Sequence, residues 1–184
     1  MKLDVIPNQP VIAATRFILR PLRRSDAGLL AMYTSDRRLA EGTSRIPHPL
    51  PPGTSEAFVA RAMAPSRHED IWALDGAEHG LAEVLGVISL TRMEMAKPGI
   101  SQSEIGYWVA PAFWNAGFAS EAVKTLIAAN PHNARSLFGR VFQDNPASAR
   151  VLTNCGFQYL GDAEIFSVAR KALVPTWTYI RQQG

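Results

Sequence analysis

The sequence predicts an α/β (α+β) protein, in which helices cover both faces of a mixed β-sheet. Short β-rich runs alternate with helical runs along the 184 residues, in the order β-α-α-β-β-β-α-β-α-β-β. Hydrophobic residues make up 47% of the chain and charged residues 19%, which is typical of a packed core. A chain of this length suits one domain, so we predict a single domain over residues 1–184, with residues 1–15 as an N-terminal extension.

The first third of the chain predicts one strand and two helices. The strand covers Arg16–Leu22, and the first helix begins at Ser25 or Asp26. Four prolines and two glycines exclude regular structure from Gly42–Ser55. A second helix follows at about Ser55–Ala64. The expected apolar sides of the two helices are formed by Leu29, Leu30, Met32 and Tyr33 and by Phe58, Val59, Ala62 and Met63.

Three strands are predicted in the middle of the chain. Asp70–Asp75 leads into a polar turn at residues 76–80, and Glu83–Met93 is rich in β-branched and apolar residues. Ser103–Pro111 alternates between two faces. One face carries Glu104, Gly106 and Trp108, and the other carries Ile105, Tyr107 and Val109.

The last third predicts two helices and three strands. A helix ending at Asn130 has an apolar stripe of Ala119, Ala122, Val123, Leu126 and Ile127. A shorter helix begins at Pro146, because Asn145 is a good N-cap and proline suits the first helical position. Gly156 is placed to end it. The three strands are Leu137–Phe142, Phe157–Gly161 and Leu173–Arg181.

Composition argues against several classes of protein. The net charge of +3 is small and scattered, so nucleic acid is not expected to be the main partner. No apolar run reaches the length of a membrane helix, and the first residues lack the pattern of a secretory signal, so we expect a cytoplasmic protein. The histidines lack metal-ligand spacing, so no metal site is expected, and the lone Cys155 is expected to be a buried filler.

The turn before the long helix is the first candidate site. A strand that runs through small residues into a helix presents free backbone amides and the positive end of the helix dipole, which suits a phosphate group. Gly117 and Ala119 leave room for a phosphate to approach the backbone. A dinucleotide fingerprint would require three glycines where this turn has one.

Two motifs together resemble a known family. "EIGYWVAPAFWNAGFASEAV" (104–123), followed by "DNPASARVLTNCGF" (144–157), is similar to the GNAT superfamily of acyl-CoA-dependent N-acetyltransferases, and within it to the RimJ/RimL-type branch. The resemblance spans about Arg16–Arg181. It implies a mostly antiparallel sheet in which Glu104–Val109 splays from Leu137–Phe142, with the pantetheine arm of acetyl-CoA in the gap.

The resemblance implies a cofactor site around the two motifs. The backbone amides of residues 114–119 would hold the pyrophosphate, Asn145 would contact the pantetheine arm, and Ser148 would lie near the thioester sulfur. Ala116 stands where many members have a basic residue, so we expect a lower affinity for coenzyme A than is typical. The expected cofactor-binding residues are Trp108, Val109, Trp114, Asn115, Ala116, Gly117, Phe118, Ala119, Asn145 and Ser148.

Two residues are the expected catalytic groups. Acetyl transfer to an amine needs a base, an oxyanion donor and a proton for the departing thiolate. Ser148 is expected to supply or orient that proton, and Glu104 is the first candidate base, ahead of Glu121 and Asp144. The backbone amide of Val109 is the expected oxyanion donor.

The acceptor is less defined than the donor. The resemblance favours a protein or peptide α-amine, with the acceptor site built by Gly42–Ser55 and by an irregular Gly161–Pro175 connection, and with Trp108 or Trp114 as a possible wall. A small-molecule amine and a non-catalytic acyl-CoA-binding module are the alternatives. A nucleotide-binding enzyme is a further alternative, but this chain lacks the glycines that such an enzyme requires. The chain is expected to act as a monomer or homodimer, with acetyl-CoA and an amine as its partners.

Overall fold

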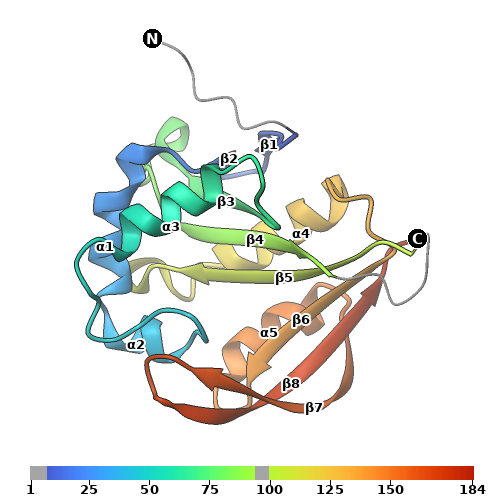
Figure 1. Cartoon of the computed structure of the whole chain (residues 1–184). Coiled ribbons are helices and arrows are strands. Elements are labelled where there is room, and N and C mark those ends of the chain that lie inside the picture. The colour runs from blue at the N-terminus through green and yellow to red at the C-terminus, as the bar shows by residue number, and fades with distance from the viewer. Residues whose placement is uncertain (1–7, 94–99) are drawn as a thin grey trace.

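The computed structural model describes residues 8–93 and 100–184, and an eight-stranded sheet dominates it (Figure 1). The strand order is β1-β2-β3-β4-β5-β6-β8-β7, and all neighbours are antiparallel except β5 and β6. This confirms the predicted mixed, mostly antiparallel sheet. The strands are β1 Ile12–Ala13, β2 Ile18–Pro21, β3 Glu69–Asp75, β4 Gly86–Arg92, β5 Gln102–Val109, β6 Ser136–Phe142, β7 Gln158–Ser167 and β8 Ala172–Gln182.

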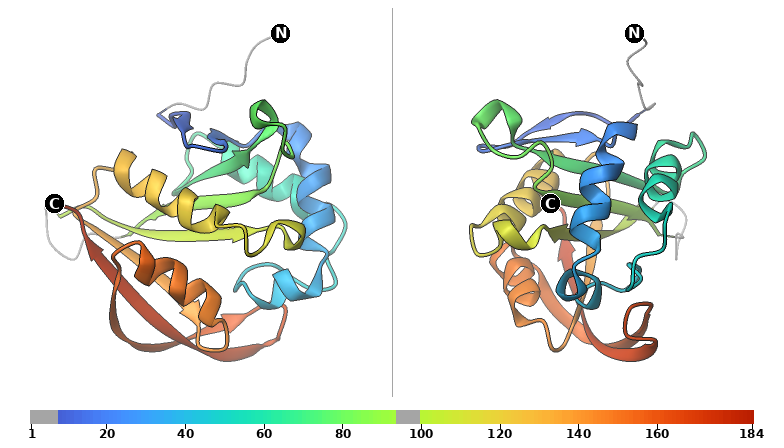
Figure 2. Two further views of the ribbon diagram at one scale, coloured as in Figure 1. Left: turned by 180° about the vertical axis from the view of Figure 1, so that it is seen from behind. Right: turned by 90° about the vertical axis from the view of Figure 1, so that its left-hand side faces the viewer.

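Helices cover both faces of the sheet. One face packs against α4 and α5, which lie in front of the sheet in the left view of Figure 2, and the other packs against α1 and α3. Each face has its own apolar core, because neighbouring side chains of the central strands point to opposite sides. The helices are α1 Ala27–Thr34, α2 Arg37–Glu41, α3 Thr54–Met63, α4 Phe118–Ala129 and α5 Pro146–Asn154.

The two parallel strands separate along their length. The register pairs Gln102 with Ser136 and ends where Ile105 faces Gly139. Beyond that point β5 continues alone toward Val109, while the rest of β6 pairs with β8 on its other side. Figure 1 shows the two strands diverging, with α5 behind the gap. The splayed pair predicted from the family resemblance is therefore confirmed.

The predicted elements are present, and some differ in extent. The structure adds the short β1 and α2, which the sequence analysis did not predict. The prediction that Gly161–Pro175 is irregular was wrong, because β7 continues to Ser167 and β8 begins at Ala172. Met32 was wrongly placed on the apolar side of α1, since it is 59% exposed.

Residues 8–15 of the predicted extension lie against the sheet, whereas residues 1–7 lie outside the described residues. Gln9 donates from Nε2 to the Ile71 carbonyl at 2.6 Å, and the Trp72 indole donates to the Pro10 carbonyl at 2.8 Å. β1 then pairs with β2, so these residues extend the sheet at its edge.

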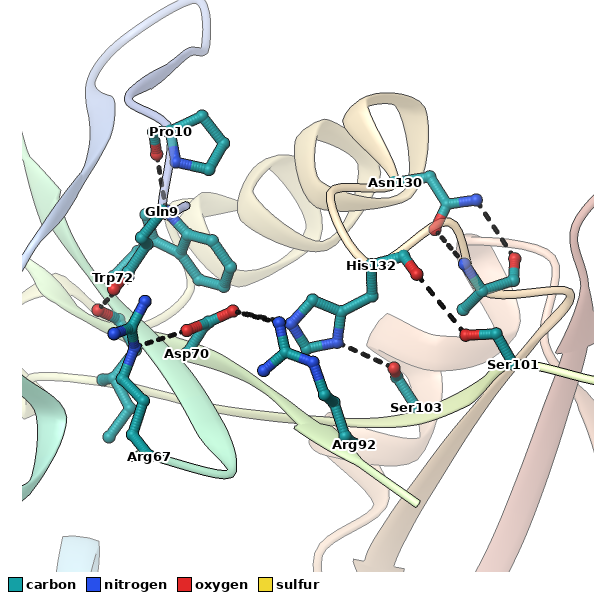
Figure 3. Close-up of polar contacts among 12 residues, drawn as sticks. Gln9, Pro10, Arg67, Asp70, Trp72, Arg92, Ser101, Ser103, Asn130 and His132 are labelled. Carbon is teal, nitrogen blue, oxygen red and sulfur yellow. Dashed lines mark hydrogen bonds and ion pairs between the residues drawn. The ribbon is translucent and has the colours of Figure 1, made fainter. Parts of the chain in front are cut away.

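A buried polar cluster ties the closed end of the splayed pair together (Figure 3). Asp70 on β3 accepts hydrogen bonds from Arg67 Nε at 2.6 Å, His132 Nε2 at 2.8 Å and Arg92 Nη2 at 3.1 Å. His132 Nδ1 lies 2.9 Å from Ser103 Oγ on β5. Burial alone would raise the pKa of Asp70, but the hydrogen bonds from His132 and Arg67 and the charges of Arg67 and Arg92 outweigh it and lower the pKa to about 2.

Candidate active site

The turn that leads into α4 presents a row of backbone donors. Among the residues that the structure describes, the N–H groups of residues 115–120 donate no hydrogen bond. Asn115 and Gly117 adopt positive φ values of 60° and 79°, which bend the chain so that α4 starts at Phe118. Free amides at a helix N-terminus, together with the helix dipole, form an anion-binding site.

Arg16 lies at the same turn, although it is about 100 residues away in sequence. Its Nη1 donates to the Ala116 carbonyl at 2.9 Å, and its Nε donates to Glu121 at 2.7 Å. The guanidinium carbon also lies 4.3 Å from the centre of the Phe118 ring. The sequence analysis missed this residue and expected a turn without a basic side chain, because only the folded chain brings the start of β2 to α4.

The open edge of β5 faces the gap between the splayed strands. Ala110 N donates to Leu85 O, so the even-numbered residues of β5 bond to β4 and the odd-numbered ones point their N–H and C=O groups toward β6. Beyond Ile105 there is no β6 partner, so the backbone N–H groups of Tyr107 and Val109 face the gap. The Val109 carbonyl accepts the Trp114 indole N–H at 2.7 Å. The Val109 amide therefore faces the gap without a strand partner.

Asn145 and Ser148 lie at the start of α5, across the gap from Tyr107. The Asn145 side-chain oxygen accepts from Ser148 N at 3.3 Å, which confirms the predicted N-cap. The Ser148 hydroxyl oxygen lies 2.9 Å from the Tyr107 hydroxyl oxygen. Tyr107 also lies within donating distance, 2.9 Å, of the Ser148 carbonyl.

Tyr107 is a further residue that the sequence analysis did not assign to the site. Its alternation with Ile105 and Val109 indicated only that it shares a face of the strand with them, and nothing local identifies Ser148 as its partner. Burial raises the pKa of Tyr107, so the phenol stays protonated and acts as a hydrogen-bond donor. Its single proton goes either to the Ser148 carbonyl or to the Ser148 hydroxyl, and the choice decides whether the serine proton is free to point elsewhere.

A cavity of about 990 Å³ lies on the other face of the sheet and extends into the gap, where Ile105, Tyr107 and Leu152 line it. Trp108 and Glu104 of β5 line it, and so do Asn145 and Ser148 at the start of α5. Its walls include parts of both segments that were predicted to form the acceptor site. The lining residues from these segments are Gly42, Thr43, Ser44, Arg45, Ile46, Pro47, Leu50, Thr54 and Ser55, and Ile165, Phe166 and Val168.

Two ion pairs lie in the wall of this cavity. Glu104 accepts from Arg140 Nε at 2.7 Å and from Arg140 Nη2 at 2.8 Å, so both carboxylate oxygens are engaged. Arg45 forms a similar two-pronged pair with Glu69, at 2.7 and 2.9 Å. Burial alone would raise the pKa of Glu69, but its hydrogen bonds, that from Arg45 foremost, outweigh it and lower the pKa.

The structure brings most of the predicted site residues together at three places: the α4 turn, the open edge of β5 and the start of α5. Trp114, Asn115, Ala116, Gly117 and Ala119 are at the α4 turn. Phe118 lies there too, but its ring is buried among Phe17 and Phe113, so only its backbone amide faces the turn. Trp108 lines the cavity and Trp114 does not.

The other candidate bases and Cys155 have structural partners. Glu121 accepts hydrogen bonds from the backbone N–H and the side chain of Arg16. Asp144 pairs with Arg170. Cys155 is buried as expected, and burial raises the pKa of its thiol. No group of three potential metal ligands is found within residues 8–93 and 100–184.

Known proteins resemble the chain in both sequence and fold. The family model of the acetyltransferase (GNAT) domain matches residues 16–158. An uncharacterised N-acetyltransferase of Bacillus subtilis (strain 168), YoaA, is 24% identical over 155 residues, which cover 83% of this chain and 85% of the relative. The ribosomal L7/L12 α-N-protein acetyltransferase RimL, solved with coenzyme A, superposes with a TM-score of 0.77 at 18% identity, over 94% of this chain and 98% of that one. The spermidine N-acetyltransferase of Vibrio cholerae gives 0.73 at 17% identity, over 91% and 96%.

The fold and the splayed site define an acyltransferase of the acyl-CoA-dependent class. The chain belongs to the acetyltransferase (GNAT) domain family. It is therefore an N-acetyltransferase, which transfers the acetyl group of acetyl-CoA to an amine. Within the described parts of the chain, no helix is both long and apolar enough to cross a bilayer.

Proposed function

We propose that the protein acetylates a primary α-amine of a protein or peptide by direct attack within a ternary complex. The observation that carries the proposal is the gap between β5 and β6. On one side of it lie the free amides of the α4 turn, and on the other lies the 990 Å³ cavity with Glu104 in its wall. The donor and the acceptor can thus approach one reaction point from opposite sides.

The α4 turn and the open edge of β5 fit coenzyme A. The N–H groups of residues 115–120 and the guanidinium of Arg16 would hold the pyrophosphate, so Arg16 supplies the charge that Ala116 lacks. The backbone of Tyr107 and Val109 would pair with the pantetheine amides as a neighbouring strand does. Asn145 caps α5 through its side-chain oxygen and keeps its side-chain N–H₂ group for the pantetheine arm.

The chemical step then needs three contributions from this chain. Bound acetyl-CoA supplies the thioester carbon that the amine attacks. The Val109 N–H stabilises the negative charge that develops on the carbonyl oxygen. Glu104 accepts the proton that the amine loses, and the Ser148 hydroxyl donates a hydrogen bond to the departing thiolate, which takes its proton from solvent. Tyr107 positions Ser148 by donating to its hydroxyl oxygen, which leaves the serine proton free to point toward the sulfur.

The solved structures support two classes of acceptor. RimL is described as an α-N-protein acetyltransferase, and the Vibrio cholerae structure is a spermidine N-acetyltransferase, so the same fold serves both a polypeptide and a polyamine. We favour the polypeptide α-amine because the cavity is wide and is bordered by the loop at residues 42–50 and the β7–β8 hairpin. A small-molecule amine is the second candidate.

The proposal also covers the domain extent, the oligomeric state and the location of the enzyme. The chain forms one acetyltransferase domain over residues 1–184, works as a monomer or homodimer and is located in the cytoplasm. We also assign the protein to the RimJ/RimL-type branch, which the likeness of its fold to RimL and to Mycobacterium smegmatis RimJ supports.

The first experiment is a thermal-shift series with acetyl-CoA, desulfo-CoA, NAD and ATP, followed by a thiol-release assay with peptide and small amines. A ligand at a hundred times its dissociation constant stabilises the folded state by about 2.7 kcal/mol, which raises the melting temperature by several degrees. We expect a shift with both coenzyme A compounds and thiol release with a peptide amine. Thiol release with small amines alone would replace the polypeptide acceptor by the second candidate.

A further inference from the structure

We propose that the acceptor carries an acidic group close to its amine, and that this group takes Arg140 away from Glu104. The inference rests on the proposed function, because it concerns the acceptor of the same site. It follows from the ion pairs in the cavity wall, from the way each carboxylate there is occupied, and from the need for a base.

The charges that line the cavity favour an anion. The ionised side chains there, histidine aside, are two glutamates and four arginines, and both glutamates are engaged by arginines. They are Glu69, Glu104, Arg45, Arg61, Arg67 and Arg140. Arg67 is directed to Asp70, whereas Arg61 is exposed on α3 and has no ion-pair partner within the described residues. Among the described residues of the wall, Arg61 is therefore the guanidinium that no carboxylate balances, and its net positive charge attracts an acidic ligand and repels a polycation.

Neither glutamate of the wall offers a free carboxylate to a second cationic group. Glu69 is held by both Nη atoms of Arg45, and Glu104 by Nε and Nη2 of Arg140. A polyamine needs free carboxylates to pair with its several ammonium groups. The site therefore differs in charge from what a polyamine acceptor requires, although the fold also occurs in a spermidine N-acetyltransferase.

The Glu104–Arg140 pair is suited to exchange. Arg140 is 40% exposed and Glu104 25% exposed, so water screens their attraction and an acceptor carboxylate can replace Glu104 on Arg140 at small cost. An arginine fork binds a carboxylate of the acceptor in the same two-pronged way as it binds Glu104. Arg45, the other fork in the wall, lies close enough to Glu104 to interact with its charge.

Transfer of Arg140 from Glu104 to the acceptor carboxylate would allow Glu104 to act as the base. While Arg140 holds both oxygens of Glu104, the carboxylate is poorly placed to take a proton from the amine. An acceptor carboxylate that binds Arg140 releases Glu104 next to the amine that it has just brought in. The amine then passes one proton to Glu104 as its nitrogen bonds to the acetyl carbon and the carbon–sulfur bond breaks. The enzyme is thus selective because the correct acceptor uncovers the base.

The test compares amines that differ mainly in charge. Tripeptide amides beginning with glutamate, glutamine or lysine would be assayed with acetyl-CoA by thiol release, with glycine and glycinamide as a small-molecule pair. A charge-assisted hydrogen bond predicts that the acidic member of a set has a kcat/KM at least about tenfold above its amide counterpart. Equal or better use of the amide or lysine member would overturn the inference.

Substitution of Arg140 identifies the group responsible. In Arg140→Gln the ratio between the glutamate and glutamine peptides should fall toward one, and Arg140→Lys should keep part of it, since lysine keeps the charge but loses the fork. Arg24→Gln, which removes an exposed arginine outside the cavity, should keep the full ratio. An unchanged ratio in a folded Arg140→Gln protein would exclude Arg140 as the receptor.

The binding measurement separates the two proposals. Acetyl-CoA could raise the melting temperature while the protein acetylates only neutral or cationic amines, or none of the amines tested. That result would contradict the acidic acceptor and leave the cofactor site in place. A melting temperature that acetyl-CoA does not raise would contradict the proposed cofactor site, and the acidic acceptor would then be rejected with it.

Discussion

Tyr107 and Ser148 hold their hydroxyl oxygens 2.9 Å apart although they are 41 residues apart in sequence. Such a pair behaves as a unit, because the proton of one hydroxyl fixes the direction of the other. The contact joins the open end of β5 to the first turn of α5. The two sides of the gap are therefore linked at the position where the thiolate would leave.

At this scale we predict that Tyr107→Phe lowers kcat about tenfold and changes KM for acetyl-CoA little, because it releases Ser148 without touching the turn at α4. Removing the hydroxyl should also cost about 1 kcal/mol of stability. Steady-state kinetics and urea unfolding provide the measurement. Tyr179→Phe is the control, since its hydroxyl makes no hydrogen bond within the described residues.

The double variant sharpens this prediction. If Tyr107 acts through Ser148, Tyr107→Phe in a Ser148→Ala background should cause almost no further loss of kcat. Losses that multiply would show that Tyr107 acts independently of the serine.

Arg16 carries a second prediction at the residue scale. Arg16→Gln should weaken the binding of coenzyme A severalfold, because the guanidinium adds positive charge beside the free amides of the α4 turn. Titration calorimetry at low and high salt measures the loss, which should shrink as salt screens the charge. Arg24→Gln should bind as the original protein does, and an unchanged affinity in Arg16→Gln would remove Arg16 from the phosphate site.

At the scale of elements, the start of α4 depends on the backbone of Gly117. Its φ of 79° is disfavoured for residues with a branched Cβ, so Gly117→Val should lose about 1–2 kcal/mol of stability. It should also reduce coenzyme A affinity at least about tenfold, since the added side chain stands where the phosphate approaches. Circular dichroism and calorimetry measure the two effects.

Gly80→Val provides the matched control for this element. Gly80 has a φ of 72° and open space around its Cα, and it lies in the turn between β3 and β4. The variant should show similar strain and normal coenzyme A affinity. If both variants lost affinity alike, general destabilisation would explain the result rather than the phosphate site.

The elements also show what the sequence could predict. Apolar periodicity found α4, and Asn145 with Pro146 found the start of α5, because these signals are local. The later part of β7 was missed because it is an edge strand exposed on both faces, so its residues show no buried alternation.

The candidate site was predictable where local signals exist. The turn proposed to bind phosphate and the cap of α5 follow from short motifs, whereas Arg16, Tyr107 and Arg140 make their contacts with partners distant in sequence. Arg140 reaches Glu104 because the parallel register sets Glu104 opposite Phe138, and no local pattern determines that register. The ion pair that occupies Glu104 was for this reason not expected.

At the scale of the whole molecule, Asp70 connects β3, β4 and the segment after α4 through one buried carboxylate. Its pKa of about 2 lies below the ordinary value of 3.8. The folded state thus favours the ionised form, and the resulting stability of about 2 kcal/mol is present above pH 4 and is lost as the pH falls from about 4 to 2. Urea unfolding across this range measures the loss.

The Asp70→Asn variant should lack this part of the pH dependence. At pH 7 it should be less stable by about 3 kcal/mol or more, because Arg67 and Arg92 keep their charges without the carboxylate. Glu78→Gln, at an exposed turn, should keep both the stability and its pH dependence. A pH dependence retained in Asp70→Asn would assign it to other carboxylates.

The position of β8 between β6 and β7 has a consequence for how the chain is made. β7 is synthesised before β8 and bonds to no other strand, so it leaves the ribosome without a partner. Until β8 follows, the backbone edge of β7 is unpaired, and its apolar side chains Tyr159, Leu160 and Phe166, which stay exposed in the folded structure, lie beside that open edge. The Val168–Ser44 backbone bond and the Arg170–Asp144 pair also form only after that hairpin docks. Biosynthesis therefore completes the cavity wall late, and no shorter nascent chain can display a finished acceptor site.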